Sequence, residues 1–267
     1  MDTVYLRSDA ILATLRTRQI GKTLLVLEEC ASTNDVAEKT ASEGAPNGFV
    51  VIADQQKQGR GRYGRVWLSP QGGIWMTVVL RPPIVSEILQ GLTLIGALAV
   101  ARGVSSDLGV RARVRWPNDV VVGQRKLGGI LAEAKVHGNE LSYALLGIGV
   151  NGNFHSFPIE GARQQPISLL DLVGSPIDRA SLISSVLAEV EQLLDCISTS
   201  GEQRFLDLLK QIESSIGRSV IVELEHKSIC QGILESYESL TKVSIRTEND
   251  QHTIVDASSA LSVVYVD

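Results

Sequence analysis

The sequence is poor in cysteine, in aromatic residues and in unbroken apolar stretches. Its 267 residues include three cysteines, Cys30, Cys196 and Cys230, which lack the paired spacing of a disulfide framework or a zinc site. We therefore expect small buried thiols in a reducing compartment. Aromatic residues make up 4% of the chain, so aliphatic side chains must fill the core.

No segment has the length and composition of a membrane span. The longest apolar stretch, residues 92–104, is interrupted by Gly96 and Arg102 and is too short to cross a bilayer. The first 14 residues carry Arg7 and Asp9 and lack the apolar centre of a signal peptide. A formal net charge of −5 argues against broad binding to nucleic acid or to a membrane surface. We expect a cytoplasmic, soluble protein without a membrane or DNA partner.

Apolar runs and turn residues predict a mixture of strands and helices. Three consecutive strands joined by short turns favour antiparallel pairing, and strict strand–helix alternation is missing. This order predicts an α+β fold rather than a doubly wound sheet. The expected strands are residues 24–27, 49–53, 74–80, 110–115, 120–122, 126–136 and 141–150. The expected helices are one that begins at Ser32-Thr33 and ends before Gly44, and others over residues 86–107, 178–197 and 202–214.

The composition changes after Ser214, where short runs rich in β-branched residues alternate with polar turns. Five such runs in about 55 residues predict a small barrel or sandwich. We predict two domains, residues 1–212 and 213–267. The expected strands of the second domain are residues 219–224, 229–234, 241–246, 252–255 and 261–266.

A polar loop gives the strongest local signal, Gln58-Gly59-Arg60-Gly61-Arg62-Tyr63-Gly64-Arg65. With Lys57, four cations fall within nine residues that also hold three glycines. Glycines let a backbone approach a ligand closely, and arginines offer paired donors to carboxylate or phosphate groups. The loop therefore fits buried anions. A flexible solvated loop is the plainer alternative, and a nucleic-acid contact is a weaker one on an acidic chain.

Three further segments are unusual. Arg115-Trp116-Pro117-Asn118-Asp119 leads from a strand into a turn, and a plain β-turn explains it equally well. Arg125-Lys126-Leu127-Gly128-Gly129 sets a lysine and two glycines in an apolar strand, which indicates either a ligand or a bulge. Residues 147–153 are glycine-rich, but neither a P-loop nor a dinucleotide fingerprint is present. Any bound ATP must be held by other means.

In order along the chain, these segments resemble the biotin–protein ligases. The resemblance extends over Ser32-Thr33-Asn34, the 59–67 loop, the Trp-Pro-Asn-Asp turn, residues 126–131 and residues 147–151, and continues into the C-terminal β region. It implies an α+β catalytic domain, shared with lipoate ligases, that has a mixed β-sheet with flanking helices, plus a small C-terminal SH3-like β-barrel. Some family members carry an N-terminal DNA-binding domain. About twenty residues precede the first expected strand, so we expect the ligase-only type.

The resemblance implies ATP-dependent activation of biotin to biotinyl-5′-AMP. Transfer to a lysine of a biotin carboxyl carrier protein follows, with release of AMP and pyrophosphate. Mg²⁺ is expected with ATP, without a fixed metal site on the protein; the carrier domain of acetyl-CoA carboxylase is the expected acceptor, and a homodimer is left open. The alternatives are a lipoate or octanoate ligase, a biotin-responsive DNA-binding regulator and a non-catalytic biotin-binding module. One departure is Arg115, where the family usually has lysine.

Charge considerations and the resemblance together assign roles to individual residues. Two anions meet in the first half-reaction, so fixed cations and N–H donors must offset their repulsion. The expected catalytic residues are Arg60, Arg62 and Lys126, with Asp119 as a base or orienting group. The expected biotin-binding residues are Ser32, Thr33, Asn34, Gln56, Gly59, Arg60, Gly61, Arg62, Lys126 and Gly128. The expected ATP-binding residues are Arg62, Arg65, Trp67, Asn118, Lys126 and Asn151.

Overall fold

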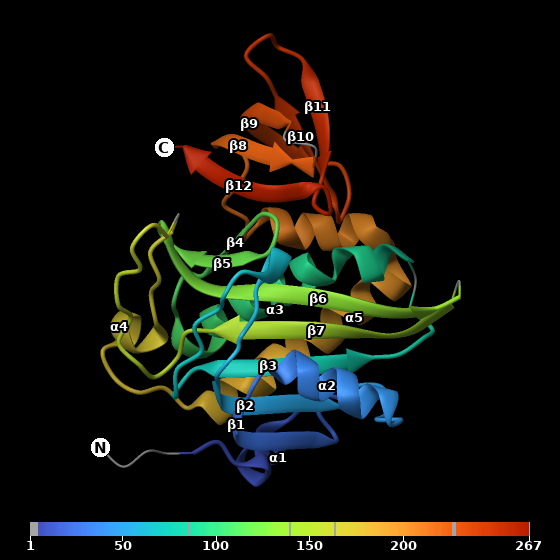
Figure 1. Cartoon of the computed structure of the whole chain (residues 1–267), viewed down its shortest axis with the longest axis vertical. Helices are drawn as coiled ribbons and strands as arrows, with labels where there is room; N and C mark the ends of the chain where they lie inside the picture. Colours follow the sequence, from blue (N-terminus) through green and yellow to red (C-terminus); the bar gives the residue numbers. More distant parts are fainter. Residues whose placement is uncertain (1–4, 85, 139, 163, 226–227, 267) are drawn as a thin grey trace.

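Two β-sheets organise the chain, as Figure 1 shows for the computed structural model. The structure describes residues 5–84, 86–138, 140–162, 164–225 and 228–266. The larger sheet has the order β1-β2-β3-β7-β6-β5-β4, in which β1 and β2 are parallel and all other neighbours are antiparallel. Its strands are β1 Leu24–Cys30, β2 Val50–Gln56, β3 Ile74–Leu80, β4 Arg113–Arg115, β5 Asp119–Val122, β6 Arg125–His137 and β7 Glu140–Val150.

Helices cover both faces of this sheet. On one face, α3 and α5 pack together, and α3 also contacts β6 and β7; on the other face, α2 contacts β2, β3 and β7. Strand β3 is an interior strand between β2 and β7, and all seven of its residues are buried, which explains its largely apolar sequence. The helices are α1 Ser8–Thr14, α2 Thr33–Ser42, α3 Ser86–Leu108, α4 Leu169–Val173 and α5 Arg179–Lys210, with a short 3₁₀ turn at Arg62–Gly64.

Helix α3 is more apolar than the other two long helices of the described chain, α2 and α5. Its window Gly91–Leu108 is long and apolar enough to cross a membrane by composition, but 67% of that window is buried inside the structure. Gly96 allows the helix to lie close to the sheet, because a Cβ there would be 2.9 Å from Ile130 and 3.1 Å from Leu146. The helix predicted over residues 86–107 is thus confirmed, and it contributes many side chains to the core.

Most predicted elements are confirmed, with three differences. The strand expected over residues 110–115 begins only at Arg113, because the amide of Ala112 donates to the carbonyl of Val110 in a local turn. The two helices expected over 178–197 and 202–214 form one element, α5, interrupted at Gly201 with φ 80° and ψ 170°. Helices α1 and α4 were not predicted, because each is too short for its periodicity to be detected.

The smaller sheet follows α5 and has the order β11-β10-β9-β8-β12, antiparallel throughout. All five predicted strands are present, so the separate C-terminal β region is confirmed. The predicted boundary at 212/213 falls between α5 and β8, and this division stays a prediction. The strands are β8 Ser219–Leu224, β9 Ile229–Tyr237, β10 Lys242–Arg246, β11 His252–Asp256 and β12 Ala260–Val266.

A small cluster joins the two sheets at the Trp-Pro turn. The amide of Trp116 donates to Ser215 Oγ at 2.8 Å, and the hydroxyl of Tyr265 on β12 donates to the carbonyl of Trp116 at 2.8 Å. The guanidinium of Arg115, 2% exposed, lies 4.9 Å from the centroid of the Tyr265 ring and donates to Gln124. A planar guanidinium stacks on an aromatic ring in a way that an ammonium group does not. Arg115, where lysine is usual in the proteins that the sequence resembles, thus bridges the two sheets.

We expect Leu98→Ala in α3 to reduce the free energy of unfolding by about 2–5 kcal/mol, because it leaves a cavity in a fully buried position. Urea unfolding followed by circular dichroism measures the change. Leu12→Ala in α1 is the matched control, since Leu12 is 44% exposed and its loss should change stability little. Equal losses in the two variants would contradict the assignment of α3 to the core.

Candidate active site

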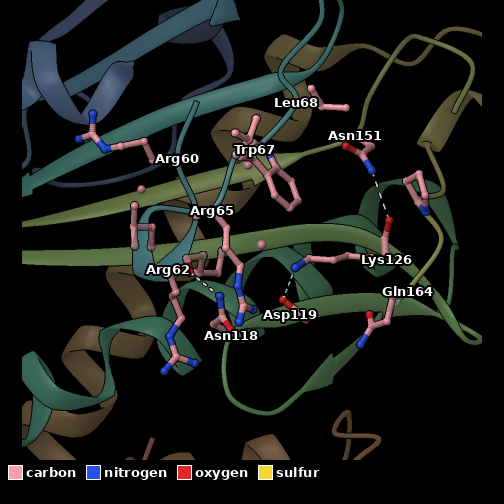
Figure 2. Close-up of a pocket in the computed structure, with 18 of the residues that line it drawn as sticks. Arg60, Arg62, Arg65, Trp67, Leu68, Asn118, Asp119, Lys126, Asn151 and Gln164 are labelled. Carbon is pink, nitrogen blue, oxygen red and sulfur yellow. Dashed lines mark hydrogen bonds and ion pairs between the residues drawn. The ribbon is translucent and has the colours of Figure 1, made fainter. Parts of the chain in front are cut away.

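A cavity of about 650 Å³ opens beside the large sheet where the glycine-rich loop crosses it. Its walls come from the β1–α2 turn, the loop, strands β3, β6 and β7, the Trp-Pro turn, the segment 154–166 and strand β12. Figure 2 shows many of these side chains directed into it. Segments far apart in the sequence therefore form one site.

Thirteen of the fifteen residues predicted for the site line this cavity. They are Ser32, Thr33, Asn34, Gln56, Arg60, Gly61, Arg62, Arg65, Trp67, Asn118, Asp119, Lys126 and Asn151.

Gly59 and Gly128 do not line the cavity, and the structure gives another reason for each glycine. A Cβ at Gly59 would lie 2.4 Å from the carbonyl oxygen of Trp67, within the loop itself. A Cβ at Gly128 would lie 2.7 Å from the carbonyl oxygen of Gly149 on the neighbouring strand. Close backbone packing therefore explains these two positions, and a direct contact of either with biotin stays a prediction.

One end of the cavity is a buried polar cluster at the start of α2. The amide and hydroxyl of Thr33 donate to Gln56 Oε1 at 2.7 and 3.1 Å, and Gln56 Nε2 donates to Ser69 Oγ at 2.8 Å. Ser32 is the N-cap residue of α2, but its side chain makes no capping hydrogen bond. Gln56 thus satisfies the first amide of the helix in its place.

Asn34 extends this polar cluster toward the rim. Its Oδ1 accepts from Thr77 Oγ1 at 2.6 Å, and its Nδ2 donates to Glu133 Oε2 at 2.6 Å. Gly147 makes room for it, since a Cβ there would lie 2.5 Å from Asn34 Oδ1. The amide is therefore fixed in orientation before any ligand arrives.

The other end contains Lys126, whose Nζ lies 2.6 Å from Asp119 Oδ1. Both side chains are largely buried, at 26% and 16% exposure. Two hydrogen bonds with Ile130 hold Asn118. The backbone carbonyl of Asn118 accepts from the amide of Ile130, and Asn118 Nδ2 donates to the carbonyl of Ile130. A positive and a negative group with fixed neighbours therefore face the same space.

Trp67 lies flat against the glycines of β6 and β7. A Cβ at Gly149 would lie 2.8 Å from Trp67 Nε1, and one at Gly129 would lie 3.3 Å from the same ring. Lys126 Nζ lies 5.1 Å from the ring centroid. The indole N–H is buried and has no hydrogen-bond partner among the residues that the structure describes. Gly129 and Gly149 thus position the ring. The sequence alone did not predict this contact.

Arg62 and Arg65 extend toward the small sheet. Arg62 Nη2 donates to the carbonyls of Ala257 and Ala260 at 2.6 and 2.9 Å, and Arg65 Nη2 donates to that of Leu261 at 3.1 Å. Within the described ranges of the chain, no carboxylate lies within ion-pair distance of either guanidinium. Both side chains line the cavity without a counter-ion, which favours an anionic ligand.

Arg60 behaves differently from the other two arginines. Its Nη2 lies 2.6 Å from Asp35 Oδ1, and this hydrogen bond is the main cause of the raised pKa of the guanidinium. Figure 2 shows it directed away from Lys126 and Asp119. The structure therefore brings together the predicted catalytic residues Arg62, Lys126 and Asp119 on one cavity, while the charge of Arg60 is already paired.

Several lining residues were not predicted. Gly129 and Gly149 belong to the unusual segments 125–129 and 147–153, so their lack of side chains is a signal in the sequence. The aromatic and amide side chains of the segment 154–166 gave no pattern, and Tyr265 lies some 150 positions after the turn it contacts. Those without a signal are Phe154, Phe157, Gln164, Leu261, Val263 and Tyr265.

In the described part of the chain, no group of three or more His, Cys, Asp or Glu side chains could hold a metal ion. Among the described residues that line the cavity, Asp119 is the one acidic residue. One carboxylate beside cations suits a Mg²⁺ ion that a polyphosphate carries, because Mg²⁺ often takes one or two carboxylates together with phosphate oxygens.

Comparison with known proteins identifies the chain's relatives. The family model described as the biotin/lipoate A/B protein ligase family matches residues 26–151. A biotin–[acetyl-CoA-carboxylase] ligase of Mycobacterium tuberculosis is 32% identical over 221 residues, covering 79% of this chain and 80% of that protein. The bifunctional ligase/repressor BirA of Bacillus subtilis is 37% identical over 176 residues, 65% of this chain and 54% of that protein. The chain thus matches about half the length of that relative.

The solved structure of a biotin protein ligase from Aquifex aeolicus in complex with biotin and ATP superposes with a TM-score of 0.78. It is 26% identical, and the match covers 92% of this chain and 100% of that one. The chain belongs to the biotin/lipoate A/B protein ligase family, within which its relatives are the biotin protein ligases. The predicted fold class is confirmed: a mixed sheet with flanking helices and a small SH3-like C-terminal domain.

We expect Gly149→Ala to displace the indole of Trp67, because the added methyl group would overlap its ring nitrogen. The displacement should shift the tryptophan emission spectrum and weaken nucleotide binding about tenfold or more, measured by fluorescence titration. The same substitution in a Trp67→Phe background should leave the emission unchanged. A spectral shift that persists in that background would contradict the contact.

Proposed function

We propose that this protein activates biotin with ATP to form biotinyl-5′-AMP and then transfers biotin to a lysine of a carrier protein. One observation carries the proposal: a single cavity has a polar, uncharged end and a cationic end. Gln56 ends β2 and Lys126 lies on β6, three strand spacings apart in the sheet, or about 14 Å. An elongated acid with a polar ring at its far end fits this separation.

The polar end suits a ureido ring, which has both donors and acceptors. Hydroxyl and amide groups are supplied there by Ser32, Thr33, Asn34 and Gln56. Thr33 and Gln56 hydrogen-bond each other, and Asn34 is held by Thr77 and Glu133. The hydroxyl of Ser32 makes no capping hydrogen bond and is left for a ligand. The dithiolane ring of lipoate and the chain of octanoate offer no such partners. The buried polar groups would remain poorly paired with either acid, which costs binding free energy. The site therefore favours biotin over the acids of the sister ligases.

The cationic end suits the meeting of a carboxylate with the α-phosphate of ATP. Lys126, Arg62 and Arg65 line this region, and preorganised cations lower the cost of bringing two anions together. Asp119 holds Lys126 in place by their ion pair. In this arrangement Lys126 contacts the carboxylate and the phosphate, while Arg62 and Arg65 exchange neutral carbonyl partners for phosphate oxygens.

The flat face of Trp67 offers a surface for the adenine ring, and Asn118 and Asn151 also line the cavity. Magnesium, bound to the phosphates of ATP, would neutralise the leaving pyrophosphate. Asp119 is the residue that would hold it on the protein side.

The second half-reaction needs a neutral lysine on the carrier, although a free lysine has a pKa of about 10.4. Asp119 lines the cavity and would orient that amine or accept its proton. No nucleophile on the enzyme is required. Cys30 is unsuited to such a role, because burial, with Asp35 and Glu29 beside it, raises the pKa of its thiol to about 11.

The biotin carboxyl carrier domain of acetyl-CoA carboxylase is the acceptor that we propose. The names of the ligases from Mycobacterium tuberculosis and Paracoccus denitrificans specify acetyl-CoA-carboxylase as their substrate. A cytoplasmic location and the division into a catalytic unit, 1–212, and a C-terminal unit, 213–267, belong to the same proposal. The two units act together, since β12 forms part of the cavity wall.

ATP–pyrophosphate exchange by the purified protein with Mg²⁺ tests the first half-reaction. We expect exchange with biotin and little with lipoate, octanoate or no acid. Exchange that prefers lipoate or octanoate would overturn the choice of substrate and leave the fold unchanged. Biotin binding without any exchange would support a non-catalytic binding module instead.

We expect Lys126→Ala to reduce biotin-dependent exchange by a factor on the order of 10² or more, since one preorganised charged donor is lost. Lys135→Ala is the matched control, because Lys135 lies on the same strand with 61% of its side chain exposed and does not line the cavity. It should change the rate less than about twofold. Near-normal exchange by Lys126→Ala would remove this lysine from the mechanism.

A further inference from the structure

The glycine-rich loop, residues 59–65, is attached to the rest of the protein at two separate points. On one side, Arg60 Nη2 lies 2.6 Å from Asp35 Oδ1 on α2 and 3.9 Å from Glu133 Oε1 on β6. On the other side, Arg62 and Arg65 donate to backbone carbonyls of residues 257, 260 and 261. The loop crosses the cavity between these attachments.

The two attachments differ in chemistry. The contacts to the small sheet are hydrogen bonds to uncharged carbonyls, which an arriving phosphate can replace. The contact at Arg60 is ionic, and the side chains of Arg60, Asp35 and Glu133 are 37%, 42% and 41% exposed. The ionic attachment therefore persists when ligand anions recruit the other arginines.

The surroundings of Arg60 are strongly acidic. Asp35, Glu133 and Glu38 all act on its guanidinium and raise its pKa, with the hydrogen bond to Asp35 as the largest cause. Lys135, 3.7 Å from Glu38, is the other cation of this cluster in the part of the chain that the structure describes. Moving Arg60 away would leave three carboxylates close to one another with a single lysine, which is unfavourable.

Glu133 also connects this attachment to the polar end of the cavity. Its Oε2 accepts from Asn34 Nδ2 at 2.6 Å, while its Oε1 faces Arg60. Asn34 is in turn fixed by Thr77. The loop is thus linked through one carboxylate to the residues predicted to hold the ring of biotin.

We propose that Asp35 and Glu133 are positioning residues that hold the glycine-rich loop across the cavity through Arg60, and so retain the adenylate between the two half-reactions. The inference rests on the proposed function, since it assigns a task within that reaction. Arg60 then serves the reaction by fixing the loop, and the cations that face the reacting groups are Lys126, Arg62 and Arg65. Loss of the ion pair releases biotinyl-5′-AMP into solution.

The test compares Asp35→Asn and Glu133→Gln with wild type and with Glu29→Gln. The last is a matched control, because Glu29 is 42% exposed, as Asp35 is, forms a 2.6 Å ion pair with Lys57 just before the loop and does not line the cavity. Release of preformed biotinyl-5′-AMP is followed by rapid gel filtration. We expect release to be about two- to fivefold faster in Asp35→Asn and Glu133→Gln, as fits a half-exposed ion pair, and unchanged in Glu29→Gln. Asp35→Glu should restore slow release.

Salt dependence separates positioning by charge from a general structural role. In wild type, release should accelerate toward about 1 M salt, where the screening length falls to about 3 Å. In Asp35→Asn the acceleration should be smaller, because only the contacts of the adenylate with the other cations remain to be screened. Trypsin cleavage after Arg62 and Arg65 should also be faster in Asp35→Asn than in Glu29→Gln, and this measurement needs no ligand.

Release and cleavage at wild-type rates in Asp35→Asn, or equal salt dependence in both proteins, would overturn the inference. A wild-type protein that forms no adenylate would overturn the proposed function, and the trypsin comparison would still decide whether Asp35 holds the loop.

Discussion

The site depends on three glycines of β6 and β7, which leave room for other side chains against the backbone of the large sheet. Gly129, Gly147 and Gly149 leave the backbones of β6 and β7 bare, so that Trp67 and Asn34 lie directly against them. A Cβ at any of these three positions would lie 3.3 Å or less from the nearest atom of Trp67 or Asn34. The missing side chains of these glycines are therefore as important for the cavity as the side chains that line it. Glycine in a strand interior often marks such a close approach.

Much of the fold could be predicted from the sequence, since long elements with clear periodicity, such as α3 and β7, carry their own signal. The glycine-rich loop and the Trp-Pro-Asn-Asp turn indicated residues of the cavity, because their unusual residue types at short spacing are visible in the sequence. Helices α1 and α4 could not be predicted, as one or two turns are too short to show a period.

What the sequence could not predict are contacts across long separations. The pairing of Arg60 with Asp35 neutralises the charge of the guanidinium, and it depends on how α2 and the loop pack together. The stacking of Arg115 on Tyr265 joins positions 150 residues apart and explains why arginine is accommodated before Trp116. Composition and spacing indicate that such residues matter, but only the packing of the two sheets determines which partner each one has.

At the start of α2, the residue that stabilises the helix end is not the residue whose hydroxyl is available to a ligand. Its first amide is satisfied by Gln56 from another strand, whereas the hydroxyl of Ser32 takes no part in capping. A ligand that engages Ser32 therefore does not compete with the helix for that hydroxyl. A ligand can therefore enter and leave the cavity without fraying of the helix end, because the hydrogen bond between Gln56 and the first amide is kept in both states.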